Sequence, residues 1–301
     1  MSCEVWTIIV TYNPDPATFQ NVLTSLEREI DAAIVVDNHS ANASALRQLT
    51  SPFGHEFLEL PDNEGIAHAQ NVGIRHAMAA GASHILLMDQ DTVLETGTVR
   101  ALLDLCSDLE SRHIRVGAVG NFFRDTHDGQ LNAIWRAHGL GIKREPVDSG
   151  PDVVAEADFI IASGSLIPVA TLRETGLMDA GLFIDLVDVE WGLRAAARGY
   201  RHFLTNRHVM AHTIGSGRKK LFGRSITLHA PIRDYYALRN ALLLVRRPYI
   251  RAAWKLYFLR RVLIFFVVFG LFTDQKKRRL SLMFRGITDG IRGCAGRCPL
   301  S

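Results

Sequence analysis

The segment His84–Thr92 places the strongest constraint on the fold, because its apolar residues run directly into two aspartates. Four consecutive apolar residues with no polar alternation are typical of a strand covered on both faces, as in a parallel sheet. Asp89 and Asp91 then lie at the carboxyl end of this strand, the edge at which open α/β sheets bind ligands. Carboxylates so placed can hold a hard divalent cation together with substrate phosphates. Two solvated loop acids, or a helix cap, are the alternative for so short a pattern.

Short apolar runs and amphipathic helices alternate through the first 120 residues. We expect strands at Val5–Val10, Ala32–Val36, Phe57–Leu60 and His84–Met88. The spacing of apolar residues predicts helices that begin at Pro16, run from Ile66 to about Ala80 and run from Val99 to Leu109. This alternation predicts an α/β fold with a doubly wound, mostly parallel sheet and right-handed crossovers.

Polar residues follow three of these strands, beginning at Thr11, at Asp37 and at Asp62. Because the carboxyl ends of parallel strands meet at one edge of a sheet, these residues are expected to converge on a nucleotide pocket. Taken alone, Asp37 is more typical of a helix cap. Neither a glycine-rich dinucleotide motif nor a P-loop motif is present, so a cation on Asp89 and Asp91 is the candidate that neutralises the phosphates.

The middle of the chain is less regular. From Phe122 to Asp152 the composition indicates a hairpin or a surface insertion outside the core. Phe159–Ile161 is expected to be a strand, after which Gly164 either admits a ligand close to the backbone or forms a bulge. A short helix is expected from Pro168 to Glu174.

A second group of acids occurs at Asp185, Asp188 and Glu190. Asp188 suits a helix N-cap and Glu190 suits the first turn, where the helix dipole favours a negative charge. Helix capping does not account for Asp185. A carboxylate at a helix start, beside a metal-bound diphosphate, could instead act as a general base. His212 could add an imidazole ligand to the cation, although a lone histidine is more often a surface or packing residue.

Six segments, taken in order, resemble the family 2 inverting glycosyltransferases with a GT-A fold; they are residues 10–13, 36–38, 62–67, 88–91, 183–191 and 212–215. The similarity covers about residues 4 to 245. It is closest to the bacterial rhamnosyltransferase branch that uses dTDP-L-rhamnose, and the segments 89–91 and 187–191 carry that closeness. The resemblance implies a GT-A catalytic domain over residues 1–225 and a helical, membrane-associating extension over residues 226–301.

The resemblance also implies a role for each matching residue. The nucleotide-sugar would contact Thr11, Tyr12, Asn13, Asp37, Asn38, Asn63, Gly65, Asn71, Asp89 and Gln90. Mg²⁺ or Mn²⁺ would be held by Asp91, Asp89 and His212, and the acceptor would be contacted by Gly164, Ser165 and Trp191. Asp188 would be the catalytic base. Because Val187 stands where the family has a glutamate, Asp185 and Glu190 are possible substitutes for that base.

The last 61 residues are strongly basic. Residues 241–301 contain 13 Lys and Arg against 2 Asp and Glu, a net charge of +11, so the first 240 residues carry −8 of the total of +3. The apolar run Val262–Phe272 is shorter than the roughly 20 residues that span a bilayer. With Arg260, Arg261 and Lys276–Arg279 beside it, the run suits a helix at an anionic membrane surface or a short re-entrant hairpin. A helix packed on the main domain is the alternative.

The resemblance, together with the basic tail, implies a metal-dependent enzyme that moves L-rhamnose from dTDP-L-rhamnose to a lipid-linked or amphiphilic glycan acceptor. We expect a peripheral location at the cytoplasmic face of the bacterial inner membrane and no nucleic-acid partner. The four cysteines, at positions 3, 106, 294 and 298, are few and scattered, which suits reduced thiols. A UDP-hexose donor is the alternative within this fold. A non-catalytic nucleotide-sugar-binding protein is the alternative of another class, and the intact acids argue against it.

Overall fold

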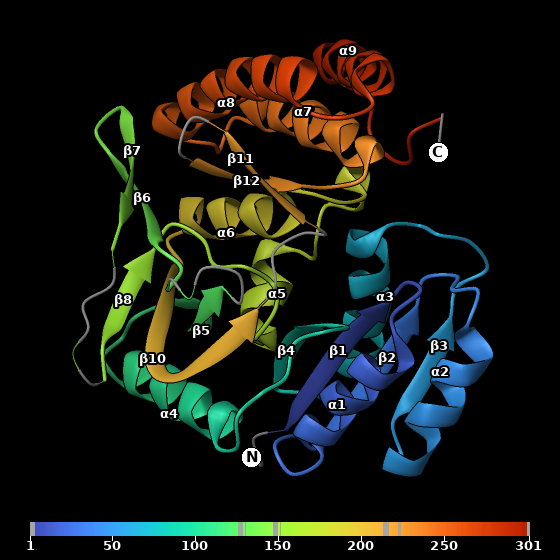
Figure 1. The fold of residues 1–301 in the computed structure, drawn as a ribbon. Coiled ribbons are helices and arrows are strands. Elements are labelled where there is room, and N and C mark those ends of the chain that lie inside the picture. Colours follow the sequence, from blue (N-terminus) through green and yellow to red (C-terminus); the bar gives the residue numbers. More distant parts are fainter. Residues whose placement is uncertain are drawn as a thin grey trace.

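The computed structural model describes residues 4–125, 129, 131–146, 150, 152–212, 217–221 and 224–299, and it describes the backbone alone at 125, 211–212, 217–221, 224–228 and 271–272. Among these residues the central element is an eight-stranded sheet with the order β3-β2-β1-β4-β9-β5-β10-β8 (Figure 1). Its strands are β1 (Val5–Thr11), β2 (Ala32–Asp37), β3 (Glu56–Glu59), β4 (His84–Asp89), β5 (Val116–Asp125), β8 (Val154–Ala157), β9 (Ser165–Pro168) and β10 (Arg201–His212).

Most of this sheet is parallel. β1 pairs in parallel with β2 and β4, β2 with β3, and β10 with β5, whereas β9 and β8 run antiparallel to their neighbours. The chain leaves β1 toward β2 on one side and returns in β4 on the other. The strand order therefore reverses between β1 and β4, and a crevice is expected beyond their carboxyl ends. The predicted α/β class with a mostly parallel sheet is confirmed.

Helices cover both faces of the sheet (Figure 1). The core on one face includes apolar residues of α1, α2 and α4, and the core on the other includes residues of α3, α6 and the C-terminal helices. These elements are α1 (Pro16–Leu26), α2 (Ala43–Thr50), α3 (Ile66–Ala79), α4 (Thr98–Ser111), α5 (Val169–Thr175) and α6 (Val187–Ala197), with short 3-10 turns at Ser51–Phe53 and Ala180–Leu182. The predictions for α1, α3, α4 and α5 are confirmed to within two residues, whereas α2 was not located from the sequence.

Two predictions for the middle of the chain are wrong. Phe122 and Phe123 belong to β5 and are 0% and 6% exposed, so this stretch is core, and the predicted hairpin begins only at β6 (Ile134–His138) and β7 (Gly141–Glu145). Phe159–Ile161 is not a strand but connects β8 to β9. Ile160 is nevertheless 7% exposed. A run of apolar residues indicates that a segment is buried, but a buried segment need not have an extended backbone.

The C-terminal helices α7 (Pro231–Arg246), α8 (Ala252–Phe272) and α9 (Lys276–Arg292) pack on the sheet domain, and the hairpin of β11 (Gly217–Leu221) and β12 (Arg224–Leu228) precedes them. One face of α8 is buried at Trp254, Phe258 and Val262, and Trp254 Nε1 donates a hydrogen bond of 2.7 Å to Asp158. The opposite face is exposed. Of the helices that the structure describes, none is long and apolar enough to cross a membrane.

The variants Phe258→Ala and Leu263→Ala compare these two faces of α8. Phe258 is 1% exposed in the core, so its truncation should lower the free energy of unfolding by about 3–5 kcal/mol. Leu263 is 69% exposed, and its truncation should change that free energy by less than about 0.5 kcal/mol. Urea denaturation of both variants measures the difference. Equal losses would contradict the one-sided packing of α8.

Candidate active site

The carboxyl ends of β1 and β2 are joined by buried polar side chains. Thr11 and Asp37 are both 0% exposed, and Thr11 Oγ1 donates a hydrogen bond of 2.8 Å to Asp37 Oδ1. Asp37 Oδ2 accepts a hydrogen bond of 2.8 Å from the main-chain amide of Ser40. Asn13 has φ = 49°, and its Oδ1 accepts from the amide of Ala41 at 2.8 Å. These contacts fix the loops that border the crevice.

Gln90 connects the ends of two of these strands. Its Oε1 accepts a hydrogen bond of 2.7 Å from the main-chain amide of Tyr12, which ties the end of β4 to the end of β1. The Tyr12 side chain is 49% exposed, so its ring is accessible to a ligand. Asn38 Nδ2 donates to Asn63 Oδ1 at 3.0 Å, and the same oxygen accepts from the amide of Gly65. The predicted nucleotide residues Tyr12, Asn38, Asn63 and Gln90 therefore lie near one another, beyond the carboxyl ends of β1, β2 and β4.

Two predicted nucleotide residues connect α3 to the second half of the chain. Gly65 has φ = +83°, and a Cβ at this position would lie 2.5 Å from the carbonyl oxygen of Phe183, so only glycine fits. Both side-chain amide atoms of Asn71 bind the main chain of Met178, at 2.8 and 2.9 Å. Asn71 is buried at 6% exposure and anchors this loop, and the structure does not bring it to the crevice.

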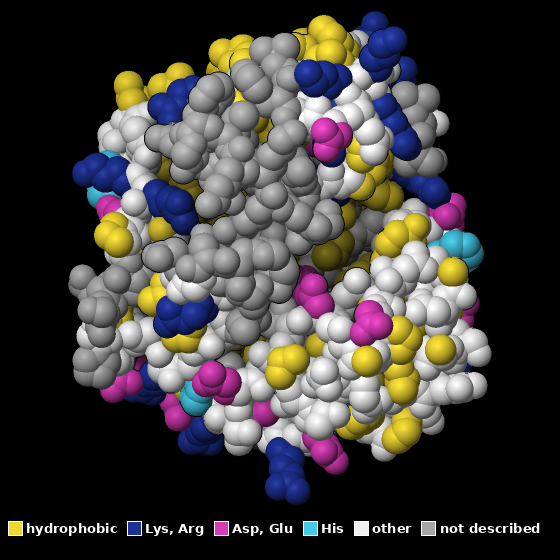
Figure 2. Space-filling model, in the orientation of Figure 1, with side chains coloured by type: hydrophobic (Ala, Val, Ile, Leu, Met, Phe, Trp, Pro, Cys, Tyr) yellow, Lys and Arg dark blue, Asp and Glu magenta, His cyan; other side chains and the backbone are white. Residues whose placement is uncertain are grey.

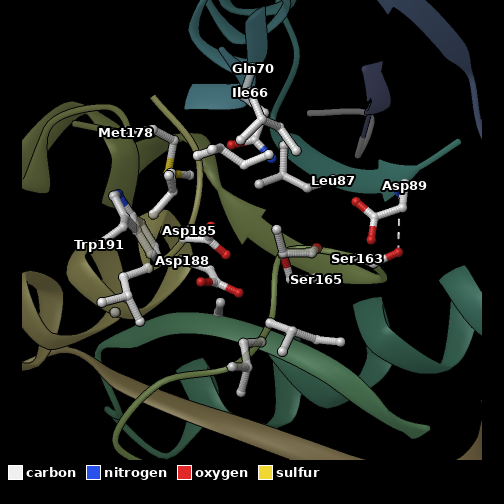
Figure 3. A pocket seen from close by; sticks show the side chains of 18 of the residues that line it. Ile66, Gln70, Leu87, Asp89, Ser163, Ser165, Met178, Asp185, Asp188 and Trp191 are labelled. Carbon is white, nitrogen blue, oxygen red and sulfur yellow. Dashed lines mark hydrogen bonds between the residues drawn. The ribbon is translucent and has the colours of Figure 1, made fainter. Parts of the chain in front are cut away.

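A cavity of about 440 Å³ connects the two groups of acids. Its lining includes Asp89, Asp185 and Asp188, which come from β4, from the loop before α6 and from α6, as Figure 3 shows. Such a volume is within the range of small-molecule sites. Its lining also contains Arg233, His229, Ser163, Ser165 and Trp191. The sequence prediction that these distant carboxylates share a site agrees with this geometry.

The predicted acceptor residues border this cavity in different ways. Ser165 is 3% exposed, and its hydroxyl donates to the carbonyl of Ala162 at 2.7 Å. Trp191 Nε1 donates to the carbonyl of Gly176 at 2.9 Å, which leaves only the ring to face a ligand. Gly164 has φ = +74°, and a Cβ there would lie 2.4 Å from the Met210 side chain. Gly164 is therefore required by packing, and it is not among the residues that line the cavity.

The loop before α6 has a strained backbone. Phe183, Asp185 and Leu186 have φ values of 64°, 68° and 62°, in the left-handed region that residues other than glycine rarely adopt. Each such residue costs on the order of 1–3 kcal/mol and persists only where its surroundings hold it. Leu186 is the N-cap of α6, so the expectation that Asp188 caps this helix is wrong, and Asp188 lies in its first turn.

The α7 side chains Arg239 and Asn240 hold this loop. Asn240 Nδ2 donates hydrogen bonds of 3.0, 2.8 and 2.8 Å to the carbonyls of Leu182, Ile184 and Asp185. Arg239 donates to the carbonyls of Gly181 and Leu182, at 3.1 and 2.8 Å. The sequence Tyr236–Asn240 resembles a Tyr-x-x-Arg-Asn segment that is common after the catalytic domain in this family, but the resemblance gave no role to these two side chains. Their partners in this loop lie more than 50 residues away.

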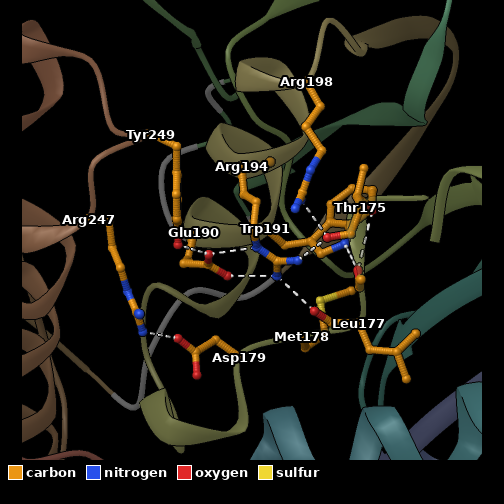
Figure 4. Close-up of polar contacts among 12 residues, drawn as sticks. Thr175, Leu177, Met178, Asp179, Glu190, Trp191, Arg194, Arg198, Arg247 and Tyr249 are labelled. Atoms are coloured by element: carbon orange, nitrogen blue, oxygen red, sulfur yellow. Dashed lines mark hydrogen bonds and ion pairs between the residues drawn. The ribbon is translucent and has the colours of Figure 1, made fainter. Parts of the chain in front are cut away.

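The three acids before and within α6 have different partners. Both oxygens of Asp185 accept hydrogen bonds from Arg233, at 2.5 and 2.6 Å. Glu190 is 1% exposed and faces away from the cavity into a network, in which it accepts from Arg194 at 2.8 and 2.9 Å and from Tyr249 at 2.5 Å (Figure 4). Asp188 accepts from the adjacent amide of Val189 at 2.8 Å.

The environment of Asp188 favours its protonated form. Burial raises the pKa of this carboxyl group above 3.8, and the neighbouring Asp185 carboxylate raises it further. Hydrogen bonds from main-chain amides, including that of Val189, act in the opposite direction. A carboxylate whose pKa is raised in this way is a stronger proton acceptor than an ordinary aspartate.

Two of the three predicted metal ligands are carboxylates after β4 or at its end. Asp89 lines the cavity and Asp91 is exposed two residues later, and such carboxylates are the hard oxygen donors that Mg²⁺ and Mn²⁺ prefer. The side chain of His212, the third predicted ligand, is outside the described residues. Among the side chains that are described, no group of three or more His, Cys, Asp or Glu residues is placed to hold a metal ion. The two carboxylates thus fit a divalent cation that takes further ligands from its substrate.

The sheet and the acidic cavity beyond its carboxyl edge define a glycosyltransferase with a GT-A fold. The chain belongs to glycosyl transferase family 2, whose model matches residues 6–157. It is 30% identical over 299 residues, 98% of each chain, to the dTDP-rhamnosyl transferase RfbF of Shigella flexneri. S. aureus TarS 1-349 in complex with UDP-GlcNAc has a TM-score of 0.62 at 15% identity, over 97% of this chain and 81% of that chain. TarS 1-349 alone has a TM-score of 0.58, also at 15% identity and with the same coverage.

The variant Asn240→Asp tests the link between α7 and the loop before α6. A carboxylate at this position would face three carbonyl oxygens and repel them, so the loop should shift. We expect turnover to fall by roughly 10²-fold, the effect of a misplacement of about 1 Å. Nucleotide binding at the ends of β1 and β4 should stay within a few-fold. Steady-state kinetics and a nucleotide titration measure the two effects, and unchanged turnover would show that Asn240 does not position the loop.

Proposed function

We propose that this enzyme is an inverting rhamnosyltransferase, which moves L-rhamnose from dTDP-L-rhamnose to a hydroxyl group of a lipid-linked or amphiphilic glycan. The observation that carries this proposal is the single cavity that joins Asp89, at the end of β4, to Asp188, in the first turn of α6. A relative of almost the same length, named a dTDP-rhamnosyl transferase, supports the choice of donor. A UDP-hexose donor is the second candidate, because a protein of the same fold binds UDP-GlcNAc.

The cation would be held by Asp89 and Asp91, with His212 as a further proposed ligand. A divalent ion there supplies Lewis-acid stabilisation of the charge that develops on the leaving diphosphate. Tyr12 and Asn63 are the proposed contacts to the base and ribose, and the buried Asp37 holds the loops that carry them. Arg233 adds a positive charge to the cavity. The developing negative charge is then met by groups that are already in place.

Asp188 is the best candidate for the base among the three acids. Arg233 occupies both oxygens of Asp185, and Arg194 with Tyr249 occupies Glu190 on the far side of α6. Asp188 accepts the proton of the acceptor hydroxyl, whose oxygen attacks the anomeric carbon from the face opposite the diphosphate. The bond to the diphosphate breaks as the new glycosidic bond forms, so the configuration inverts.

The variants Asp188→Asn and Glu190→Gln separate the base from a structural acid. Asp188→Asn should lower the chemical step by roughly 10²-fold to 10⁴-fold while donor binding is retained. Glu190→Gln leaves the partly buried Arg194 with a weaker partner, so it should lower the melting temperature more than the rate at permissive temperature. Single-turnover kinetics and thermal melts measure these effects. The opposite pattern would assign the base to Glu190.

The rate should also depend on pH through Asp188. The base works only when deprotonated, and the pKa of Asp188 is raised, so activity should be lost as the pH falls through a value above 3.8. Asp185→Asn removes a neighbouring negative charge and should move this acidic limb to lower pH. A pH–rate profile of both proteins tests the prediction, and an acidic limb that does not move would argue against Asp188.

The variant Asp91→Asn tests the metal together with the donor. We expect dTDP to bind the unchanged enzyme more tightly when Mg²⁺ or Mn²⁺ is present, and we expect Asp91→Asn to abolish this difference. Calorimetric titration with and without the cation measures it. A panel of dTDP- and UDP-sugars then identifies the donor by product formation. Binding that is indifferent to the cation would remove Asp91 from the mechanism, and turnover of UDP-hexoses alone would favour the second candidate.

The exposed face of α8 supports a membrane-bound acceptor. A continuous stripe of large apolar side chains is 43–69% exposed there, and it consists of Leu256, Leu259, Leu263, Ile264 and Val267. Phe284 of α9 extends the stripe and contacts Phe266 edge-on at 4.9 Å between ring centroids. Exposed cations occur on the same two helices, namely Arg260, Arg261, Lys276, Lys277 and Arg278. Hydrophobic and basic side chains lie next to one another over α8 and α9 at the top of Figure 2.

This combination is complementary to the surface of an anionic bilayer, to which apolar burial and opposite charge both attract a protein. Arg279 does not contribute, because it is 6% exposed and paired with Asp234 at 2.6 Å inside the protein. The occupant that we propose is therefore the anionic lipid surface, with the enzyme peripheral to the cytoplasmic face of the inner membrane.

Sedimentation with vesicles separates the two attractions. Replacing Lys276, Lys277 and Arg278 by Gln should weaken sedimentation with anionic vesicles at low salt, by about 1 kcal/mol for each charge near the surface. Leu263→Ser should weaken it at every salt concentration, because apolar burial is not screened. Replacing Arg100 of α4 and Arg112, which follows α4, by Gln is the control, since both are exposed on another side of the molecule. Equal loss in the control would mean nonspecific charge attraction.

A further inference from the structure

Gln70 of α3 has a buried oxygen whose partner is not supplied by the described protein. The residue is 5% exposed, and its Oε1 has no hydrogen-bond donor among the described residues. Gln70 also lines the cavity that contains Asp89 and Asp188. A buried carbonyl oxygen without a donor is unfavourable, and most such groups in proteins are paired. An unpaired one at the wall of a cavity indicates that a ligand donates to it.

The position of Gln70 fits the sugar between the two reacting ends. Figure 3 shows Gln70 and Ile66 on one side of the cavity and Asp185, Asp188 and Ser165 on the other, with Asp89 at one end. A diphosphate bound near Asp89 and a base at Asp188 would place the transferred sugar between them. The Gln70 side chain then faces this sugar and neither reacting group.

Several neighbouring polar atoms of the cavity are engaged within the protein. The hydroxyls of Ser163 and Ser165 donate to Thr92 at 2.9 Å and to Ala162 at 2.7 Å. His202 Nδ1 also has no partner among the described residues, but it lies 2.7 Å from the position that a Cβ on Gly117 would occupy, so the ring is packed against the backbone there. Gln70 is thus a neutral acceptor on the cavity lining whose oxygen has no partner among the described residues.

The surroundings of Gln70 are apolar. Ile66, Leu87 and Met178 lie beside it in the cavity (Figure 3). A sugar that fits there would present one hydroxyl group to Gln70 and an edge without hydroxyl groups to these side chains. A 6-deoxyhexose has such an edge, because its C6 is a methyl group. A hexose would instead place its C6 hydroxyl against the apolar wall, where it would lose its hydrogen bonds to water.

We propose that Gln70 is a specificity residue for the transferred sugar, which it recognises by accepting a hydrogen bond from a ring hydroxyl, while Ile66, Leu87 and Met178 enclose the methyl group of a 6-deoxyhexose. The identity of this sugar rests on the proposed function. The role of Gln70 as a contact to the sugar does not, because it follows from the unpaired oxygen and from the place of the residue in the cavity lining.

The test compares the binding of a nucleoside diphosphate with that of the corresponding nucleotide-sugar. Gln70→Met conserves volume and removes the acceptor oxygen. We expect it to leave the affinity for dTDP within twofold and to weaken dTDP-L-rhamnose by about tenfold, the effect of one hydrogen bond. Thr7→Val is the matched control, because Thr7 Oγ1 is equally buried and without a donor but its residue does not line the cavity. It should change neither affinity.

Three results would overturn this role: equal weakening of dTDP and dTDP-L-rhamnose, no weakening of either, or an increase in the acceptor KM alone, which would assign Gln70 to the acceptor. If Gln70→Met melts far below the unchanged protein, Gln70→Leu replaces it in the same comparison. If the enzyme binds a different nucleotide-sugar, the proposed donor fails, and the same comparison with that donor and its own nucleoside diphosphate still decides the role of Gln70.

Discussion

The geometry of the site depends on one amide group, Asn240 Nδ2, which donates to three carbonyls of the loop before α6. Three residues of that loop have positive φ, and they would relax to ordinary conformations without this support. The loop carries Asp185 and leads directly into Asp188. The strain is therefore maintained at the place where the proposed proton transfer needs a fixed carboxylate, and the group that maintains it belongs to the C-terminal helices.

The basic C-terminal region is consequently part of the catalytic structure and also a candidate surface for lipid. Arg279 pairs with the buried Asp234 of α7, and Tyr235 donates to Asp289 of α9 at 2.9 Å, so α9 holds α7 in position. Burial raises the pKa of Asp234 to about 6, while the bond from Arg279 opposes this rise. Part of the +11 charge of this region is thus neutralised inside the protein. Arg247 and Arg297 also pair with acids of the sheet domain, Asp179 and Asp62.

The sequence was sufficient to predict the structure where a local pattern of residues is compatible with a single structure. Residues 84–89 form a central strand, as predicted. The acids that follow it lie at the edge of the sheet, because the carboxyl ends of parallel strands all meet at that edge. The same kind of pattern wrongly predicted a strand at Phe159–Ile161. The apolar side chains of this segment pack in the core, but its backbone is not part of a strand. The roles of Gln70 and Arg233 could not be predicted at all. Each depends on a partner or a cavity formed by segments more than 40 residues apart.

Electrostatics explains why such a cavity would bind its donor together with a cation. Asp89, Asp185 and Asp188 all line it, and Arg233 is the one described Lys or Arg side chain in that lining, already bound to Asp185. A nucleoside diphosphate would add more negative charge to a site with an excess of carboxylates, which Coulomb repulsion opposes at these short distances. A divalent ion held by Asp89 and Asp91 would reverse the sign of the field at that end of the cavity, away from Asp188. The leaving group and the proposed base would then be stabilised at opposite ends of the same cavity.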